Sequence, residues 1–308
     1  AQLLQHGLLK ASFIPPAAIR DLRDLTRDRT LLVSERTRVA NRIQKILEDA
    51  NIKLASVVTD ILGVSGRAML KAIVAGQSDP EQLAELARGT LRGKISQLVE
   101  VLTGTLRSAH RFRLEQHLQQ LEFIESQIGA LEAEIERQNV PFQESVRLLA
   151  EIPGFNRVAA WSVLAEIGVD MDQFPTAAHL ASWAGVCPGN HESAGKRMGG
   201  RIRPGNRWLR EKLTQSAWAA SRSKKSYFSA FFHRMAARRG KKRAIVALGH
   251  ALLVVCYYLL KRQVAFQDLG IDYFDHLNEQ RLTRYFVKRL TRLGHHVVLD
   301  PLPQPSAV

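Results

Sequence analysis

The sequence predicts a mainly α-helical protein, in which a long antiparallel helical arm of coiled-coil type precedes a helical domain containing a helix-hairpin-helix. Three observations lead to this fold class. Apolar residues recur at helical spacing over two long stretches, few runs alternate with the period of two that strands require, and glycine and proline interrupt the pattern. The 308 residues are 45% hydrophobic and 24% charged, as in an ordinary globular protein.

We divide the chain into three segments: residues 1–16, the end of a preceding segment with its linker; residues 17–140, the arm; and residues 141–308, a second domain. Pro15-Pro16 and Pro141 mark the two boundaries, because proline interrupts a helix and can begin the next one. The chain starts at Ala1 within an apolar, helix-like stretch, so we expect a fragment whose beginning is missing. We expect the last residues, 301–308, to be frayed.

The arm is predicted from two heptad patterns. Leu25, Leu32, Val39 and Ile46 follow one another at seven-residue intervals, and seven apolar residues between positions 114 and 135 have a mean spacing of 3.5. A coiled coil and an ordinary pair of amphipathic helices are nearly the same prediction here, and dimerisation through the arm stays open. Between the two long helices we expect shorter helices, broken at Gly63, Gly66 and Gly76. Asp79 is the expected N-cap of a helix that begins at Pro80.

Positive charge is concentrated in one part of the chain. The net charge is +15, and residues 196–243 hold 16 Lys and Arg against the single acid Glu211, so the rest of the chain is neutral. Such a concentration predicts an anionic partner, nucleic acid before an anionic membrane surface. The apolar residues 244–260 are just long enough to cross a bilayer, but a buried core helix explains them better. Two cysteines 69 residues apart exclude a disulfide scaffold and indicate a reducing compartment.

Residues 148–168 have the layout of a helix-hairpin-helix: an apolar turn of helix, the Pro153-Gly154 turn and a second helix from about Asn156 to Glu166. In such a motif the glycine lets the backbone approach a phosphate, and the amides at the start of the second helix bind it. We therefore expect Gly154, Asn156 and Arg157 to bind nucleic acid. Two core helices joined by a Pro-Gly turn are the alternative.

A glycine-rich, basic segment follows at residues 182–210, with Ser193 in its least regular part. A serine hydroxyl there could attack a phosphodiester if cations stabilised the developing charge, although serines in such loops are more often turn or capping residues. We expect the polar and basic residues of the segment to contact phosphates: Lys196, Arg197, Arg201, Arg203, Asn206, Arg207 and Arg210.

A third basic run, residues 234–243, ends in Lys241, Lys242 and Arg243, which we expect to clamp phosphates without sequence preference. Trp208, Trp218, Tyr227 and Phe228 interleave with basic residues and could stack on unpaired nucleotides, but at helical spacing core packing is the commoner role.

No metal site is predicted within the chain. His191, His295 and His296 lack partners at ligand spacing. Glu166, Asp170 and Asp172 could be imagined as a magnesium cluster but fit capping and surface roles better.

Several separated motifs resemble, in order and spacing, the insertion-sequence transposases of the 116/110/902 family. HGLLKASFIPP, IRDLRDLTRDRTLL, NRIQKILEDANIKL and DILGVSGRAML are similar to its linker and arm. EIPGFNRVAAWSVLAEIG, FPTAAHLASWAGVCPGNHESAGK and RIRPGNRWLREKL are similar to its C-terminal transposase domain.

The resemblance implies a two-part DNA-recombining enzyme. An N-terminal ribonuclease-H-like domain binds Mg²⁺ through an Asp-Glu-Asp-Asp set, and a serine of the C-terminal domain, here Ser193, attacks DNA. It also implies DNA and a structured guide RNA as partners, a homo-oligomer, and a cytoplasmic, nucleoid-associated protein without membrane contact. The last two aspartates of the family's metal set precede the segment that AQLLQHGLL matches, so we expect the Mg²⁺ ligands to be absent and this fragment alone to be inactive. A non-catalytic nucleic-acid-binding module is the alternative function, and a peripheral membrane protein is a third.

Overall fold

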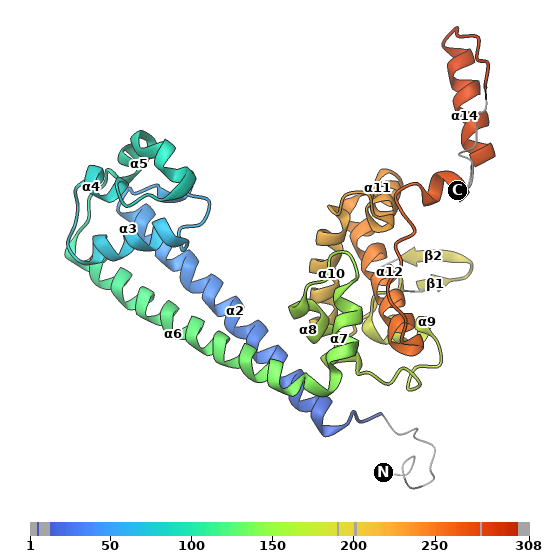
Figure 1. Cartoon of the computed structure of the whole chain (residues 1–308), viewed down its shortest axis with the longest axis horizontal. Helices are drawn as coiled ribbons and strands as arrows, with labels where there is room; N and C mark the ends of the chain where they lie inside the picture. Colours follow the sequence, from blue (N-terminus) through green and yellow to red (C-terminus); the bar gives the residue numbers. More distant parts are fainter. Residues whose placement is uncertain (1–4, 6–12, 190, 200–201, 278, 301–308) are drawn as a thin grey trace, which may run out of the picture. The chain divides into compact units, whose positions relative to one another are not determined.

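The computed structural model describes residues 5, 13–189, 191–199, 202–277 and 279–300 (Figure 1). The chain divides into two compact units, one formed by Arg20–Val140 and the other by Ala1–Ile19 together with Pro141–Val308. Helices make up nearly all the regular structure of the described residues, which confirms the mainly α fold class. A short two-stranded hairpin is the exception among them.

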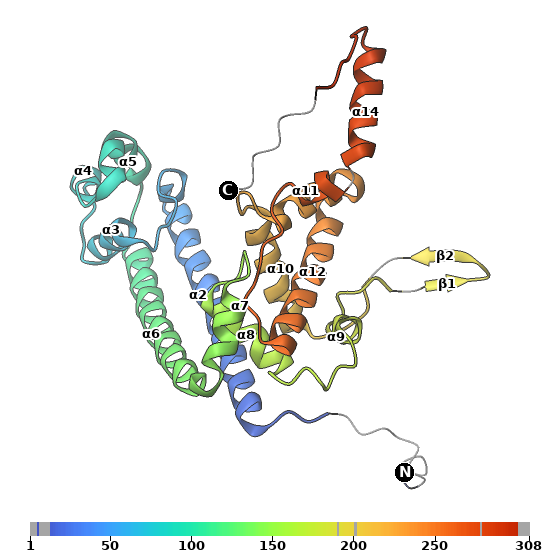
Figure 2. The same ribbon diagram turned by 45° about the vertical axis from the view of Figure 1, so that its right-hand side comes forward.

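The unit of residues 20–140 is built on two long helices, α2 (Ala17–Asp49) and α6 (Ser108–Gln138), with a group of short helices at one end (Figures 1 and 2). The short elements are η1 (Leu54–Ser56), α3 (Val64–Val74), α4 (Pro80–Ala84), η2 (Gly89–Lys94) and α5 (Ile95–Leu102). Asp79 caps α4 as expected, since its side chain accepts a hydrogen bond from the Glu81 amide at 3.0 Å.

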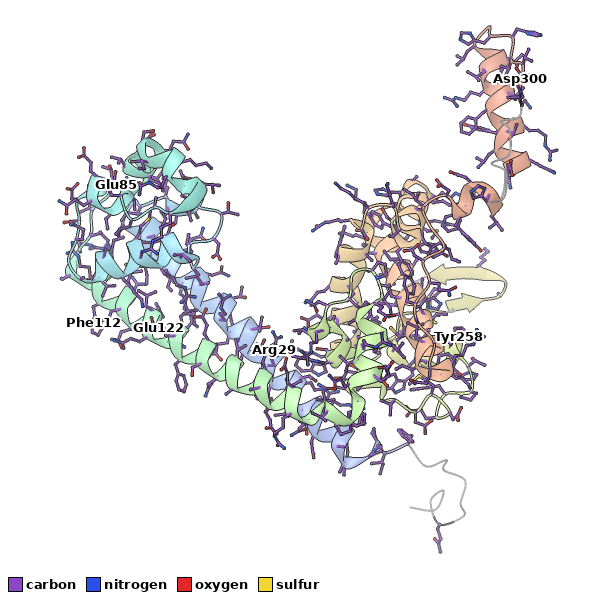
Figure 3. All side chains as sticks on the ribbon, in the orientation of Figure 1. Arg29, Glu85, Phe112, Glu122, Tyr258 and Asp300 are labelled. Atoms are coloured by element: carbon purple, nitrogen blue, oxygen red, sulfur yellow. The ribbon has the colours of Figure 1, made fainter. Side chains whose placement is uncertain are left out.

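Ion pairs fix the antiparallel register of α2 and α6. Arg29, labelled in Figure 3, pairs with Glu132 at 2.5 Å, and Arg36 pairs with Glu125 at 2.7 Å. The two arginines are one heptad apart on α2, and the two glutamates are one heptad apart in the opposite direction on α6. The Arg67 guanidinium of α3 also reaches Glu125, at 2.6 Å, so this carboxylate joins three helices.

The buried stripe of α2 differs from the predicted one in its first half. Val39 and Ile46 are fully buried as predicted, but Leu25 and Leu32 are only half-buried. Thr26 and Thr30 are buried instead, and each hydroxyl donates to a backbone carbonyl of the preceding turn. A pattern of apolar residues cannot identify these positions, because a threonine satisfies its own polar group inside the helix.

Gly66 was predicted to break a helix, and this prediction is wrong. The residue lies inside α3. A Cβ at this position would meet the Ile61 carbonyl oxygen at 2.2 Å, so glycine is required for close packing of α3 on the preceding loop. Gly63 precedes α3 and Gly76 follows it, and both act as boundaries.

The second unit contains η3 (Val140–Phe142), α7 (Gln143–Ala150), α8 (Arg157–Ile167), α9 (Ala177–Ala184), β1 (His191–Ser193), β2 (Lys196–Gly199), α10 (Arg207–Ser221), α11 (Tyr227–Arg239), α12 (Lys241–Arg262), α13 (Tyr273–Leu277) and α14 (Glu279–Arg292). α12 is the central helix and contacts α7, α9, α10 and α11.

α12 contains the membrane-like stretch of the sequence. It is long and apolar enough to cross a bilayer, yet 56% of its most apolar window is buried inside the protein, as in a core helix. Leu248, Leu252 and Cys256 lie on the buried face without measurable exposure. Burial of this face against four helices explains the apolar run without a membrane.

Candidate functional site

Ser193 is the last residue of β1 and so lies at the tip of a β-hairpin rather than in an irregular loop. Figure 2 shows this hairpin, β1 and β2. Ser193 pairs with Lys196, the first residue of β2. Ala194 and Gly195 form the turn between them, with φ angles of 49° and 74°. Two left-handed residues in a two-residue loop are the geometry that matches the twist of paired strands. The hairpin was missed in the sequence because Gly195 is the only strong turn signal in the Ala194-Gly195 pair.

Two glycines close the base of this hairpin. A Cβ on Gly185 would meet the Arg203 carbonyl oxygen at 2.8 Å, and a Cβ on Gly205 would meet the backbone of Ala184 at 2.6 Å. The two chain segments therefore touch backbone to backbone, which only glycine permits. Pro188 and Ile202 form an isolated antiparallel bridge above this contact. The base of the hairpin is consequently fixed to α9 and to the start of α10.

Asn206 holds the next element in place. Its side-chain oxygen accepts from the Leu209 amide at 3.0 Å and caps α10, while its nitrogen donates to Glu166 Oε2 at 2.5 Å. Glu166 is a residue of α8 and is 3% exposed. Both polar atoms of Asn206 make hydrogen bonds inside the protein, and its contact with nucleic acid stays a prediction. Sequence reasoning missed the buried role of Glu166.

The tip of the hairpin is exposed and carries positive charge. The side chains of Ser193 and Lys196 are both exposed. Directly paired residues on neighbouring strands point to the same side of the sheet, with Cβ atoms ~5 Å apart. The register therefore places the Lys196 side chain next to that of Ser193 on the same face of the hairpin.

The other predicted basic residues of the segment have different surroundings. The backbone of Arg197 lies opposite that of Glu192 in the strand register, and Arg201 lies outside the described residues. Arg203 is exposed, and the exposed Arg207 guanidinium lies 4.7 Å from the Trp208 ring centroid. Arg210 is half-buried on α10.

The turn between α7 and α8 is packed against α10. Gly154 has φ 90°, and a Cβ there would meet the Ser216 carbonyl oxygen at 2.4 Å and the Ala220 amide at 2.6 Å. Glycine is thus explained by helix packing, and its approach to a phosphate stays a prediction. Asn156 caps α8 by accepting from the Ala159 amide at 2.8 Å. The Asn156 and Arg157 side chains are exposed, so they can reach a ligand in solution.

Lys241, Lys242 and Arg243 form the first turn of α12 and are exposed. Gly240 precedes them and provides no side-chain cap, and the turn contains no acidic residue. Cations at a helix N-terminus oppose the helix dipole, at a cost of about 0.3–1 kcal/mol each. A bound anion would relieve this repulsion, which supports the predicted phosphate clamp.

Among the predicted aromatic residues, packing is the main role that the structure shows. Phe228 is buried, and Trp218, which is 38% exposed, contacts the Phe232 ring at a centroid distance of 5.9 Å. Trp208 is half-buried. Tyr227 stacks on Phe274 with centroids 5.2 Å apart, and burial, with a smaller contribution from Tyr273, raises the pKa of its hydroxyl.

The described residues do not fit a magnesium site. No group of three His, Cys, Asp or Glu side chains gathers anywhere among them. Asp170 accepts from the Asp172 amide at 2.9 Å in a local turn, and Asp172 pairs with Lys261 at 3.3 Å. Glu166 is turned toward Asn206. We therefore derive no catalytic step through a metal from these residues.

Comparison with known proteins adds independent information. A sequence model of the family described as "Transposase IS116/IS110/IS902 family" matches residues 146–233, which include the hairpin, and a DEDD-type transposase model of the IS110 group matches residues 1–52. The DEDD type suggests a divalent metal.

Two relatives are called pilin gene-inverting proteins, from Moraxella bovis and Moraxella lacunata. Each is 32% identical over 122 residues, which is 39% of this chain and 38% of the relative. The chain thus spans well under half the length of the curated relatives it matches. The two family sequence models describe one transposase group and match different parts of the chain. They agree with the motifs noted in the sequence. Residues 1–52 and 146–233 of the chain are therefore similar to insertion-sequence transposases of the IS116/IS110/IS902 family.

Proposed function

We propose that this protein binds DNA and exchanges DNA strands with Ser193 as the nucleophile. The observation that carries the proposal is the exposed position of Ser193 at the tip of a hairpin, directly across from Lys196. The fixed base of the hairpin supports it further, because a nucleophile must be held in a defined place to be effective. The family match over residues 146–233 includes this hairpin.

The proposed reaction is a transesterification. Ser193 Oγ attacks the phosphorus of a DNA phosphodiester, one P–O bond to the DNA breaks, and a new P–O bond to serine forms. The serine proton leaves to a base, and the released DNA hydroxyl takes up a proton. A hydroxyl of another strand then attacks the phosphoserine, which rejoins DNA and regenerates the serine. The number of phosphoester bonds is conserved, so no external energy source is needed.

Positive charge beside the nucleophile serves this chemistry. The pentacoordinate transition state carries more negative charge on its oxygens than the starting diester, so a fixed cation stabilises it. We propose Lys196, which the strand register pairs with Ser193, as this cation. Arg203, Arg207 and the first turn of α12 would hold the flanking phosphates without reading sequence.

The names of the relatives support strand exchange rather than simple DNA binding. Inverting a gene segment requires that strands be cut and rejoined in a new arrangement, and the two Moraxella proteins are named for inversion. We extend the proposal to Mg²⁺ as cofactor, to a structured guide RNA, to a homo-oligomer and to a nucleoid-associated location in the cytoplasm. The similarity to this family supports these, and contacts at Asn156 and Arg157 complete the proposed interface.

Replacing Ser193 by Ala tests the function. Recombination is measured in cells that carry the complete open reading frame encoding this chain, and DNA affinity is measured on the purified protein. We expect Ser193→Ala to abolish recombination and to keep DNA affinity within about twofold, because the hydroxyl contributes no charge to binding. Ser182→Ala, an exposed serine of α9, is the matched control and should recombine normally. Normal recombination by Ser193→Ala would instead favour the alternative of a non-catalytic nucleic-acid-binding module.

A further inference from the structure

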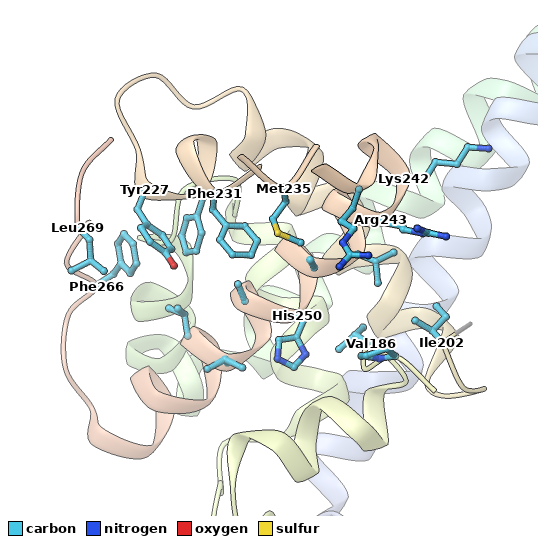
Figure 4. Close-up of a pocket in the computed structure, with 18 of the residues that line it drawn as sticks. Val186, Ile202, Tyr227, Phe231, Met235, Lys242, Arg243, His250, Phe266 and Leu269 are labelled. Carbon is cyan, nitrogen blue, oxygen red and sulfur yellow. The ribbon is translucent and has the colours of Figure 1, made fainter. Parts of the chain in front are cut away.

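An apolar groove of about 1390 Å³ lies between α11, α12 and the segment 266–269. Figure 4 shows its two ends: Tyr227, Phe266 and Leu269 lie at one, and Lys242 and Arg243 lie at the other, near Ile202. Ile202 belongs to the bridge at the base of the Ser193 hairpin, and its bridge partner Pro188 also lines the groove. The groove therefore leads from an aromatic end to the foot of the candidate catalytic hairpin.

The groove exposes a face of α12 that core packing does not use. Its wall on this helix consists of half-buried residues at spacings of one, three and four: Val246, Ala247, His250, Ala251, Val254 and Val255. Scattered exposed apolar residues are ordinary, but a continuous apolar stripe that lines a groove indicates a binding surface.

The opposite wall comes from α11, where Tyr227, Phe231, Met235 and Arg239 recur at every fourth residue. The segment after α12 closes the aromatic end. Asp268 accepts from the Tyr227 amide at 2.8 Å, and Phe266 stacks on Phe228 with centroids 5.9 Å apart. The aromatic walls are thus held in place before any ligand binds.

The charge of the lining residues restricts the occupant. Arg239, Lys242 and Arg243 are basic, and no acidic residue is among the described residues that line the groove. Burial lowers the pKa of His250, whose Nδ1 lies 3.8 Å from Cys187 Sγ, and so disfavours the charged form of its ring. An occupant must therefore combine apolar or aromatic surface with negative charge at one end.

Unpaired nucleotides have this combination. In a duplex the faces of the bases are covered by their neighbours, so apolar walls gain contact only with bases that have left the stack. Phosphates of the same strand would lie on the cations at the other end of the groove. An acidic amphipathic helix has similar chemistry, but nucleic acid is favoured because the groove continues to the base of the hairpin that carries the proposed nucleophile.

We propose that this groove holds two or three unpaired nucleotides of the strand that leads to Ser193, with their bases between Tyr227, Phe231 and Met235 and the apolar face of α12. The inference rests on the proposed function for its ligand, nucleic acid, but not on the serine chemistry. It assigns to α11 and α12 a preference for unpaired strands that the phosphate contacts alone do not supply.

Filling the groove tests the proposal. Ala247→Phe places a ring in the groove, and Ala219→Phe, at an exposed position of α10 outside the groove, is the matched control. Both are made in the full chain with Ser193→Ala. The probes are a labelled DNA duplex, the same duplex with three central unpaired nucleotides, and an RNA of the same design. Anisotropy at one salt concentration gives the affinities.

We expect the unmodified groove to prefer the unpaired probe by about tenfold, the size that stacking of one or two bases supports. Ala247→Phe should remove this preference while duplex affinity stays the same, and Ala219→Phe should keep it. A preference shown by the DNA probe supports the proposed occupant, and a preference confined to the RNA probe would contradict it. An unchanged preference in Ala247→Phe overturns the proposal.

A second measurement covers the case in which Ala247→Phe does not fold. Photo-crosslinking of 5-iodouracil in the unpaired stretch to the chain with native groove residues should label Tyr227, Phe231, Met235 or His250. Crosslinks only outside the groove would contradict the proposal and leave a protein helix as the occupant. Neither affinity nor crosslinking depends on the chemistry of Ser193. The groove proposal and the nucleophile proposal can therefore fail independently of one another.

Discussion

Replacing Gly205 by Ala should open the base of the Ser193 hairpin. The new Cβ would lie 2.6 Å from the Ala184 carbonyl carbon and oxygen and 2.6 Å from the Gly185 Cα. Ordinary carbon contacts are ~3.5–4.0 Å, so one of the two backbone segments must move by about 1 Å. No flexible side chain is present at this contact to take up the strain.

Overpacking of this kind costs about 1–3 kcal/mol. For a domain of this size each 1 kcal/mol lowers the melting temperature by about 2–4 °C, so we expect a decrease of ~2–12 °C. Circular dichroism on the 308-residue chain measures it, and limited trypsin digestion reports on the hairpin and its base, which contain Lys196 and Arg203, respectively. Faster cleavage within residues 186–204 should accompany the lower melting temperature.

Gly129→Ala is the control for this experiment. Gly129 lies inside α6, and a Cβ there has no neighbour within 4 Å. Alanine should therefore stabilise the helix by ~0.5–1 kcal/mol. If Gly205→Ala melts with the parent protein and its hairpin is cleaved at the same rate, the glycine contact does not fix the hairpin and the reasoning is refuted.

Three further predictions concern other parts of the molecule. Gly154→Ala should destabilise the second unit by at least ~2 kcal/mol in a urea titration, because it combines a clash at 2.4 Å with a left-handed backbone; unchanged stability would contradict the packing on α10. Burial raises the pKa of Glu125, but hydrogen bonds and charges from Arg67 and Arg36 outweigh it and lower the pKa below 4.5. The carboxylate therefore stabilises the fold above pH ~4.5 and loses this effect as the pH falls through its folded pKa. Glu125→Gln should lower the free energy of unfolding by ~1 kcal/mol at pH 7 and by less near pH 3. A loss of stability that is the same at both pH values would argue against the ion pairs. Lys242→Ala should weaken duplex binding for every sequence and reduce the slope of log K against log salt by about 0.9; an unchanged slope would show that it contacts no phosphate.

Much of the fold follows from local sequence patterns. The heptads locate α2 and α6, Asp79 caps α4, and Asn156 caps α8 at the predicted position. These features depend on residues close together in the chain, where helix periodicity and capping are decisive. Thr26 and Thr30 show the limit of the method, because burial of a hydroxyl is decided by what packs against the helix.

The candidate site is less predictable, because its geometry depends on contacts between distant residues. Gly185 and Gly205 are required because the backbones of their two chain segments touch in the folded protein. Glu166 of α8 finds its hydrogen-bond partner, Asn206, only when these distant segments pack together. The sequence identified Gly154 as special, but the reason seen in the structure is the approach of α10. The face of α12 that lines the groove belongs to a stretch of sequence that is apolar on all sides of the helix. A run of this kind shows no period that separates a core face from a binding face.

Recovery of the covalent intermediate tests the central claim most directly. The complete open reading frame is expressed, mixed with donor DNA and Mg²⁺, denatured during the reaction and digested with nuclease and protease. Mass spectrometry of the peptide around the hairpin should then show a nucleotide joined to Ser193 through a phosphodiester, and Ser182→Ala should give the same product. A nucleotide attached to a different residue, or recombination that continues with alanine at position 193, would contradict the account.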